Sequence, residues 1–165
     1  MENLSNPLSV KELGFLERAI ELSRQAIEDG HGGPFGCVIV KDDEIIGEGC
    51  NMVTSSNDPT AHAEVVAIRE ACKFLGHYQL DDCELYTSCE PCPMCLGAIY
   101  WARPCKVIYA NTKQDAAAIA FDDAFIYDEI SADMHERKIP FVHYAHAKAL
   151  EVFTAWKNKP GKKIY

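Results

Sequence analysis

Apolar residues recur at helical spacing early in the chain, directly after a sequence typical of a helix start. Ser9 and Glu12 have the spacing of a capping box, in which each side chain accepts a hydrogen bond from the backbone N–H of the other residue. Leu16 and Ile20 belong to the apolar series that follows, with the period of one helix face. The pattern therefore predicts a helix from Ser9 to about Asp29 with a broad apolar face.

Short apolar runs then alternate with stretches of helical period. The short runs predict strands, and the turn residues between the first two indicate a hairpin. Strands that alternate with helices favour an α/β fold, with a parallel-rich sheet and helices on both faces. The predicted strands are Phe35–Val40, Ile45–Asn51, Cys83–Thr87, Cys105–Ala110 and Ile139–Tyr144, and the predicted later helices are two that end near Gly76 and Arg103, Lys113–Ala120 and Ala147–Lys157.

Length and composition are typical of one folded domain. The chain has 165 residues and a formal net charge of −9 with neutral histidines, and no linker or repeat divides it, so we expect a single domain over residues 1–165. No apolar run has the length of a membrane span, and an acidic chain lacks the basic footprint that binds nucleic acid. Without a secretory signal at the start, we expect a cytoplasmic protein whose eight cysteines are free or bind metal.

Two short stretches carry the candidate chemistry, and each opens a predicted helix. The first, Thr60-Ala61-His62-Ala63-Glu64, supplies an imidazole and a carboxylate, and the second supplies the thiols of Cys92 and Cys95. Cysteines three residues apart share a helix face, and the positive end of the helix favours their thiolate forms. One histidine and two cysteines leave the fourth position of a tetrahedral zinc ion open, as in catalytic zinc sites.

Other interpretations of the cysteines exist. A Cys-x-x-Cys pair could be a redox pair, or part of a four-ligand structural zinc site that includes Cys89 or Cys83. The run Cys89-x-x-Cys92-x-x-Cys95 could also begin an iron–sulfur motif, but that motif needs another cysteine shortly afterwards and position 99 is isoleucine. The His-x-Glu at a helix start makes the catalytic zinc interpretation the more specific one.

The combination H-x-E…P-C-x-x-C is the signature of zinc-dependent nucleobase deaminases. The chain resembles the cytidine deaminase-like superfamily and, within it, the bacterial guanine deaminase family. The resemblance covers nearly the whole chain after the first few residues, and Phe121-Asp122-Asp123 and the terminal tyrosine are the features that narrow it to guanine. It rests on Gly32–Gly36, Asp58–Glu64, Cys89–Cys95 and Phe121–Asp123.

The resemblance implies a three-layer α/β/α fold around a mixed five-stranded sheet. It also implies hydrolytic deamination of guanine to xanthine and ammonia, with one Zn²⁺ ion per subunit. The zinc ligands would be His62, Cys92 and Cys95. Glu64 would transfer protons between water, the ring nitrogen and the leaving ammonia.

Several further residues are expected at the substrate. The resemblance assigns base binding to Asn51 and Tyr165, and substrate contact with a possible second proton transfer to Asp123. Phe35 and Trp101 offer aromatic faces on which a base could stack, although core or interface roles are about as common for such residues. Ala63 is expected beside the base.

The resemblance also concerns the partner of this chain and its substrate. In the family the C-terminal segment is exchanged across a homodimer, which here would involve residues 131–165. The expected substrate is a free purine base, with no nucleic acid and no membrane as partner. Guanosine, the adenosine of a tRNA, and a non-catalytic role for the zinc remain as alternatives.

Overall fold

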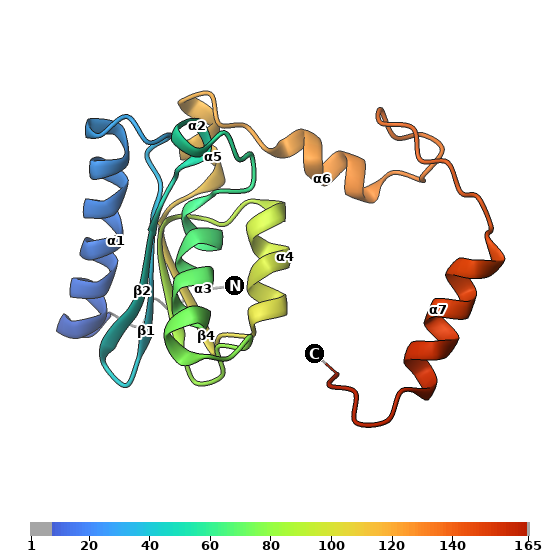
Figure 1. Cartoon of the computed structure of the whole chain (residues 1–165). Helices are drawn as coiled ribbons and strands as arrows, with labels where there is room; N and C mark the ends of the chain where they lie inside the picture. The colour runs from blue at the N-terminus through green and yellow to red at the C-terminus, as the bar shows by residue number, and fades with distance from the viewer. Residues whose placement is uncertain (1–7, 165) are drawn as a thin grey trace, which may run out of the picture. The chain divides into compact units, whose positions relative to one another are not determined.

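The computed structural model describes residues 8–164, which divide into two compact units, one ending at Ala124 and one beginning at Phe125. The first unit contains a sheet with helices around it (Figure 1). Its elements are α1 (Val10–Glu28), β1 (Gly36–Lys41), β2 (Glu44–Cys50), α2 (Val53–Ser56), α3 (Ala63–Leu75), β3 (Glu84–Cys89), α4 (Pro93–Ala102), β4 (Lys106–Asn111) and α5 (Lys113–Ala118). The second contains most of α6 (Ala124–Ser131) and all of α7 (Ala147–Asn158).

The sheet is mixed and has the order β2-β1-β3-β4. β1 pairs antiparallel with both β2 and β3, and β3 pairs parallel with β4. The expectation of a parallel-rich sheet is therefore wrong, whereas the mixed sheet is confirmed. The turn between β1 and β2 consists of Asp42 and Asp43, both at positive φ. So short a turn can join only antiparallel neighbours.

The sheet has four strands where five were expected, because residues 139–144 form no strand. Alternating apolar residues give this segment the composition of a strand. A strand also needs a neighbour that bonds its backbone N–H and C=O groups, and composition does not supply one. In the described part of the second unit no strand is present to pair with this segment.

Helices cover both faces of the sheet, which confirms the three-layer arrangement. Along β1, Cys37 and Ile39 point to the core beneath α3 and α4, whereas Val38 and Val40 point to the core beneath α1. Figure 1 shows α1 on one side of the strands and α3 with α4 on the other. This alternation is the period-two pattern of a strand that is buried on both faces.

The approach of α3 to the sheet depends on two glycines of β2. A Cβ atom at Gly49 would lie 2.3 Å from the backbone oxygen of Ala63, and one at Gly47 would lie 2.6 Å from that of Ala67. Only hydrogen atoms fit between these backbones, so α3 rests directly on β2. The contact fixes the beginning of α3, where the candidate zinc ligand His62 lies.

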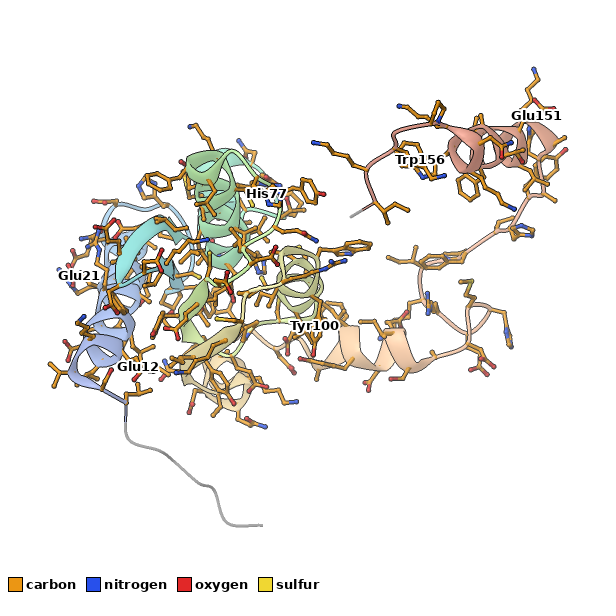
Figure 2. The ribbon with its side chains drawn as sticks, turned by 90° about the horizontal axis from the view of Figure 1, so that it is seen from below. Glu12, Glu21, His77, Tyr100, Glu151 and Trp156 are labelled. Carbon is orange, nitrogen blue, oxygen red and sulfur yellow. The ribbon has the colours of Figure 1, made fainter. Side chains whose placement is uncertain are left out.

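The second unit presents apolar side chains to solvent. No described residue of this unit is buried, and Leu150, Phe153 and Trp156 of α7 are exposed. Figure 2 labels Trp156 on this helix. α6 covers a stretch for which the sequence predicted no helix, since its aromatic and acidic residues show no clean helical period. Among the described helices, none combines the length and apolar composition needed to cross a membrane.

Candidate metal centre and active site

The predicted zinc ligands lie together at the first turns of two helices. His62 is the N-cap of α3 and Cys92 the N-cap of α4, both with extended backbone, and Cys95 follows in the first turn of α4. The three donor atoms lie within 4.8 Å of one another. The predicted ligand set is thus brought together by the fold.

Local sequence explains why each helix begins where it does. Before α3, the Asp58 carboxylate accepts hydrogen bonds from the backbone N–H and hydroxyl of Thr60, at 2.8 and 2.7 Å, and makes a tight turn. Before α4, the Glu90 N–H donates to the Asn111 carbonyl, and Pro93 occupies the first helical position, which suits proline. Each ligand therefore follows a backbone segment that is held in place.

The donor set fits zinc in both chemistry and spacing. The His62 Nδ1 atom lies 3.5 Å from the Sγ atoms of both Cys92 and Cys95. In a tetrahedral site with ordinary Zn–N and Zn–S bond lengths, nitrogen and sulfur donors lie about 3.5 Å apart. One imidazole and two thiols at this spacing match a zinc site that leaves one position for water or substrate.

Hydrogen bonds within the cluster favour one thiolate even without metal. The pKa of Cys92 is lowered to about 4 because its sulfur accepts hydrogen bonds from Cys95 and His62. The pKa of Cys95 is raised by its hydrogen bond with Cys92 and by burial. The pKa of His62 is raised through its hydrogen bond with Cys92. Because metal ligands must be deprotonated, zinc binding would release these protons.

Glu64 lies beside the cluster without belonging to it. Its side chain is only 6% exposed, and its Oε2 atom accepts a hydrogen bond of 3.3 Å from the Cys95 thiol. Burial raises the pKa of the Glu64 carboxyl. A carboxyl with a raised pKa next to an open metal position can both accept and return a proton.

The neighbouring cysteines do not join the cluster, which among the described residues contains only the three predicted donors. The Cys89 thiol lies 3.6 Å from the Thr112 carbonyl oxygen, and burial raises its pKa to about 11. The Cys83 thiol lies 3.6 Å from the Asp81 carbonyl oxygen. A four-ligand structural zinc site that includes Cys89 or Cys83, and an iron–sulfur site, therefore have no support in the described fold.

Asn51 is buried, with 5% of its surface exposed, and its amide orientation is fixed. Its Oδ1 atom accepts hydrogen bonds from the backbone N–H groups of Gly33, at 3.3 Å, and Val53, at 3.2 Å. The reverse orientation would place the side-chain NH₂ group against two N–H donors. The NH₂ group is thus the part of Asn51 available as a donor to another molecule.

The predicted residue Phe35 contacts Phe121, which lies two residues before the predicted residue Asp123. Phe35 packs against the core beneath α3 and meets Phe121 edge to face, with ring centroids 5.0 Å apart. Burial, and then the negative charge at Cys92, raise the pKa of Asp123. The importance of Phe121 and Gly33 as packing partners was not visible in the sequence, because their contact is tertiary.

The other predicted substrate residues differ in position. Ala63 is fully buried at the start of α3, between His62 and Glu64. Trp101 is 64% exposed and lies six residues beyond Cys95 on α4, about 9 Å further along the helix axis. Its contact with substrate stays a prediction. Tyr165 lies outside the described residues.

The fold and the site define the class of protein. Residues 10–111 match the family described as the cytidine and deoxycytidylate deaminase zinc-binding region, and the chain belongs to this family. The family and the three-donor cluster together fit one zinc ion per subunit.

Within that class, the chain is similar to named deaminases over different lengths. It is 62% identical to the guanine deaminase of Bacillus subtilis (strain 168) over 151 residues, which are 92% of this chain and 97% of the relative. The X-ray structure of guanine deaminase from Bacillus subtilis superimposes with a TM-score of 0.90 at 61% identity, covering 93% of this chain and 98% of the other. A tRNA-specific adenosine deaminase of Aquifex aeolicus (strain VF5) is 46% identical over 96 residues, 58% of this chain and 63% of the relative.

Proposed function

We propose that this chain converts guanine and water to xanthine and ammonia. The observation that carries the proposal is the buried Glu64 carboxyl beside three zinc donors that leave one coordination position open. This arrangement suits hydrolytic replacement of an amine on an aromatic ring. The near full-length similarity to a guanine deaminase supports guanine as the substrate.

His62, Cys92 and Cys95 would hold the zinc ion. When bound at such a site, zinc acts as a Lewis acid that makes water nucleophilic near neutral pH. The oxygen of one water molecule becomes the new oxo group of xanthine, and the exocyclic nitrogen of guanine leaves as ammonia. No oxidant or other reactant is required.

Glu64 is proposed as the group that moves protons. As a carboxylate it accepts a proton from the attacking water, and as a carboxylic acid it donates to the ring nitrogen next to the reacting carbon. It then accepts the remaining proton of the added water and transfers it to the departing amine. Its position in the first turn of α3, with burial that raises its pKa, suits both protonation states.

The base itself would be held by the residues around the Gly32-Gly33 loop. The NH₂ group of Asn51 donates to an acceptor on the purine, such as a ring oxo group, because its Oδ1 atom is already engaged by two backbone N–H groups. The Phe35 ring lines the space for the base. Ala63 is fully buried within this unit and lies behind that space, next to Glu64. Asp123 contacts the substrate and serves as the second proton carrier.

We further propose a homodimer in which residues 131–165 are exchanged between subunits, with Tyr165 reaching the substrate. α4 is apolar on all sides: Ile99 is buried within the unit, whereas Leu96, Tyr100 and Trp101 are exposed. Figure 2 labels Tyr100 on this helix. A helix with this composition is expected to be covered. α7 also exposes apolar residues, so contact between α4 of one subunit and α7 of the other would bury apolar surface on both helices. In this arrangement Trp101 contacts the exchanged segment.

The size and charge of the substrate follow from the same features. A net charge of −9 favours a small uncharged base over a nucleic acid. The similarity to tRNA-specific adenosine deaminases covers 58% of this chain in one relative and 66% in another, against 92% for the guanine deaminase, so adenosine in tRNA is the weaker candidate. All eight cysteines are free, and a zinc site with two thiols suits a reducing compartment such as the cytoplasm.

The test compares wild-type protein with Glu64→Gln and measures xanthine formation after zinc loading. We expect Glu64→Gln to fold and bind zinc while kcat falls by about 10²- to 10⁴-fold, the usual contribution of general acid–base catalysis. Glu70→Gln is the matched control, since Glu70 lies exposed on the same helix. Undiminished turnover by Glu64→Gln would refute the assigned role, and a wild-type protein that forms no xanthine would refute guanine as the substrate.

A further inference from the structure

Phe121 has a well-defined contact that the proposed chemistry does not use. Its ring meets the ring of Phe35 at an interplanar angle of 89°, with centroids 5.0 Å apart. This is the edge-to-face geometry that aromatic pairs prefer. Phe121 is 46% exposed and belongs to neither core cluster, whereas Phe35 packs against the core beneath α3. Core packing therefore does not account for the position of Phe121.

The backbone of the preceding loop lies directly against both rings. A Cβ atom at Gly33 would lie 2.7 Å from the Cζ atom of Phe121 and 3.1 Å from the Cε2 atom of Phe35. The absence of a side chain at position 33 lets the two rings meet beside the loop. Gly33, Phe35 and Phe121 thus form one close-packed group.

The same group continues to Asn51. The Gly33 N–H donates to Asn51 Oδ1, and the Asn51 N–H donates to the Phe35 carbonyl at 2.9 Å. A Cβ atom at Gly32 would lie only 2.1 Å from Asn51 Oδ1, so the loop also packs tightly around the amide. The two residues proposed to hold the base are therefore fixed to each other, and Phe121 supports the Phe35 side of the group.

We propose that Phe121 is a positioning residue for base binding, which acts by holding the Phe35 ring in its orientation beside Gly33. This inference rests on the proposed function, in which Phe35 and Asn51 contact the purine. Phe121 itself need not touch the substrate. Without its ring, Phe35 would lose its edge contact on the partly open side and could turn, while the zinc donors and Glu64 would stay in place.

The expected effect therefore falls on substrate binding more than on chemistry. Phe121→Ala should raise KM for guanine about three- to tenfold, the range that corresponds to the loss of one aromatic pair, and change kcat by less than about threefold. Phe121→Leu keeps apolar bulk beside Gly33 and adds no polar atom to the ring atom that faces the loop, so it should restore part of the wild-type KM. Phe74→Ala is the matched control, because Phe74 is exposed and lies on α3 near its far end.

A double-mutant cycle tests whether Phe121 acts through Phe35. KM and kcat are measured for wild type, Phe35→Ala, Phe121→Ala and the double variant, each with its zinc content and melting temperature. We expect the double variant to have the same KM as Phe35→Ala alone. Independent effects that multiply in the double variant, or an unchanged KM in Phe121→Ala, would overturn the inference. A fall in kcat without a rise in KM would instead indicate displacement of Asp123 and would also overturn it.

Binding of the product xanthine, measured by calorimetry on the same four proteins, separates this inference from the proposed function. If the wild type deaminates a different purine, the proposed function is wrong in its substrate. The double-mutant cycle of Phe35→Ala and Phe121→Ala is then measured with that purine. A non-multiplicative cycle there still supports the role of Phe121. A wild-type protein that neither turns over nor binds any purine contradicts both proposals.

Discussion

The contact between Gly49 and α3 gives a direct test of how the fold positions the site. In Gly49→Ala, the new Cβ atom would lie 2.3 Å from the Ala63 carbonyl oxygen and 2.6 Å from the Ala67 backbone nitrogen. Ordinary Cβ contacts begin at about 3.4 Å, so β2 and the start of α3 would have to separate by about 1 Å. The obstructing atoms belong to the backbone and cannot move to another rotamer.

That displacement would move residues of the proposed active site. His62 and Glu64 flank Ala63, so a proposed zinc ligand and the proposed proton carrier would shift by about the same distance. A 1 Å displacement of catalytic groups can lower the rate about 100-fold. Overpacking of a core contact typically lowers the free energy of unfolding by about 1–3 kcal/mol. We therefore expect kcat/KM to fall about 100-fold and stability to fall by about 1–3 kcal/mol in Gly49→Ala.

The assay measures xanthine formation and urea denaturation of the zinc-loaded variant. Gly14→Ala is the control, because a Cβ atom at this position of α1 meets nothing within 4 Å. Alanine there should raise the free energy of unfolding by about 0.5–1 kcal/mol without changing activity. Wild-type kcat/KM in Gly49→Ala would refute the reasoning, whether or not the variant is less stable.

Three other perturbations have defined outcomes. Cys92→Ala should lose stoichiometric zinc, seen by metal analysis, and with it all turnover, because two protein donors hold the ion far less well; full metal content would contradict the ligand assignment. Glu48→Gln should lose about 1 kcal/mol of unfolding free energy at pH 7, since the Arg18 guanidinium donates two 2.7 Å hydrogen bonds to Glu48 and both side chains are about one third exposed. Arg18 lowers the pKa of Glu48 below its ordinary value of 4.5, so this stabilisation is complete above 4.5 and lost as the pH falls through the lower folded value; a difference between the two proteins that does not shrink as the pH is lowered below 4.5 in urea denaturation would exclude this origin. Gly33→Ala should raise KM for guanine, and the same change should have a smaller effect in a Phe121→Ala background, because one of the two obstructing rings is gone.

Local signals explain what the sequence predicted correctly. The capping box at Ser9 placed the start of α1, and His62 and Cys92 were recognised because zinc ligands at helix starts follow a short, fixed pattern. The strand expected at residues 139–144 failed, since pairing depends on a distant neighbour that composition does not reveal.

The contacts that position the site could not be predicted from the sequence either. Gly49 and Phe121 contact residues that are far away in the chain. The sequence does not show which distant residue a glycine or an exposed aromatic residue contacts. The sequence could name the donors, but their support depends on tertiary packing.

The most direct test of the central claim is ammonia release from zinc-loaded protein with guanine, guanosine, adenine, adenosine and cytosine in parallel. The proposed function predicts rapid release from guanine, accompanied by an equal amount of xanthine, and little from the other four. Preferential turnover of guanosine, or release from adenosine or cytosine with none from guanine, would contradict it.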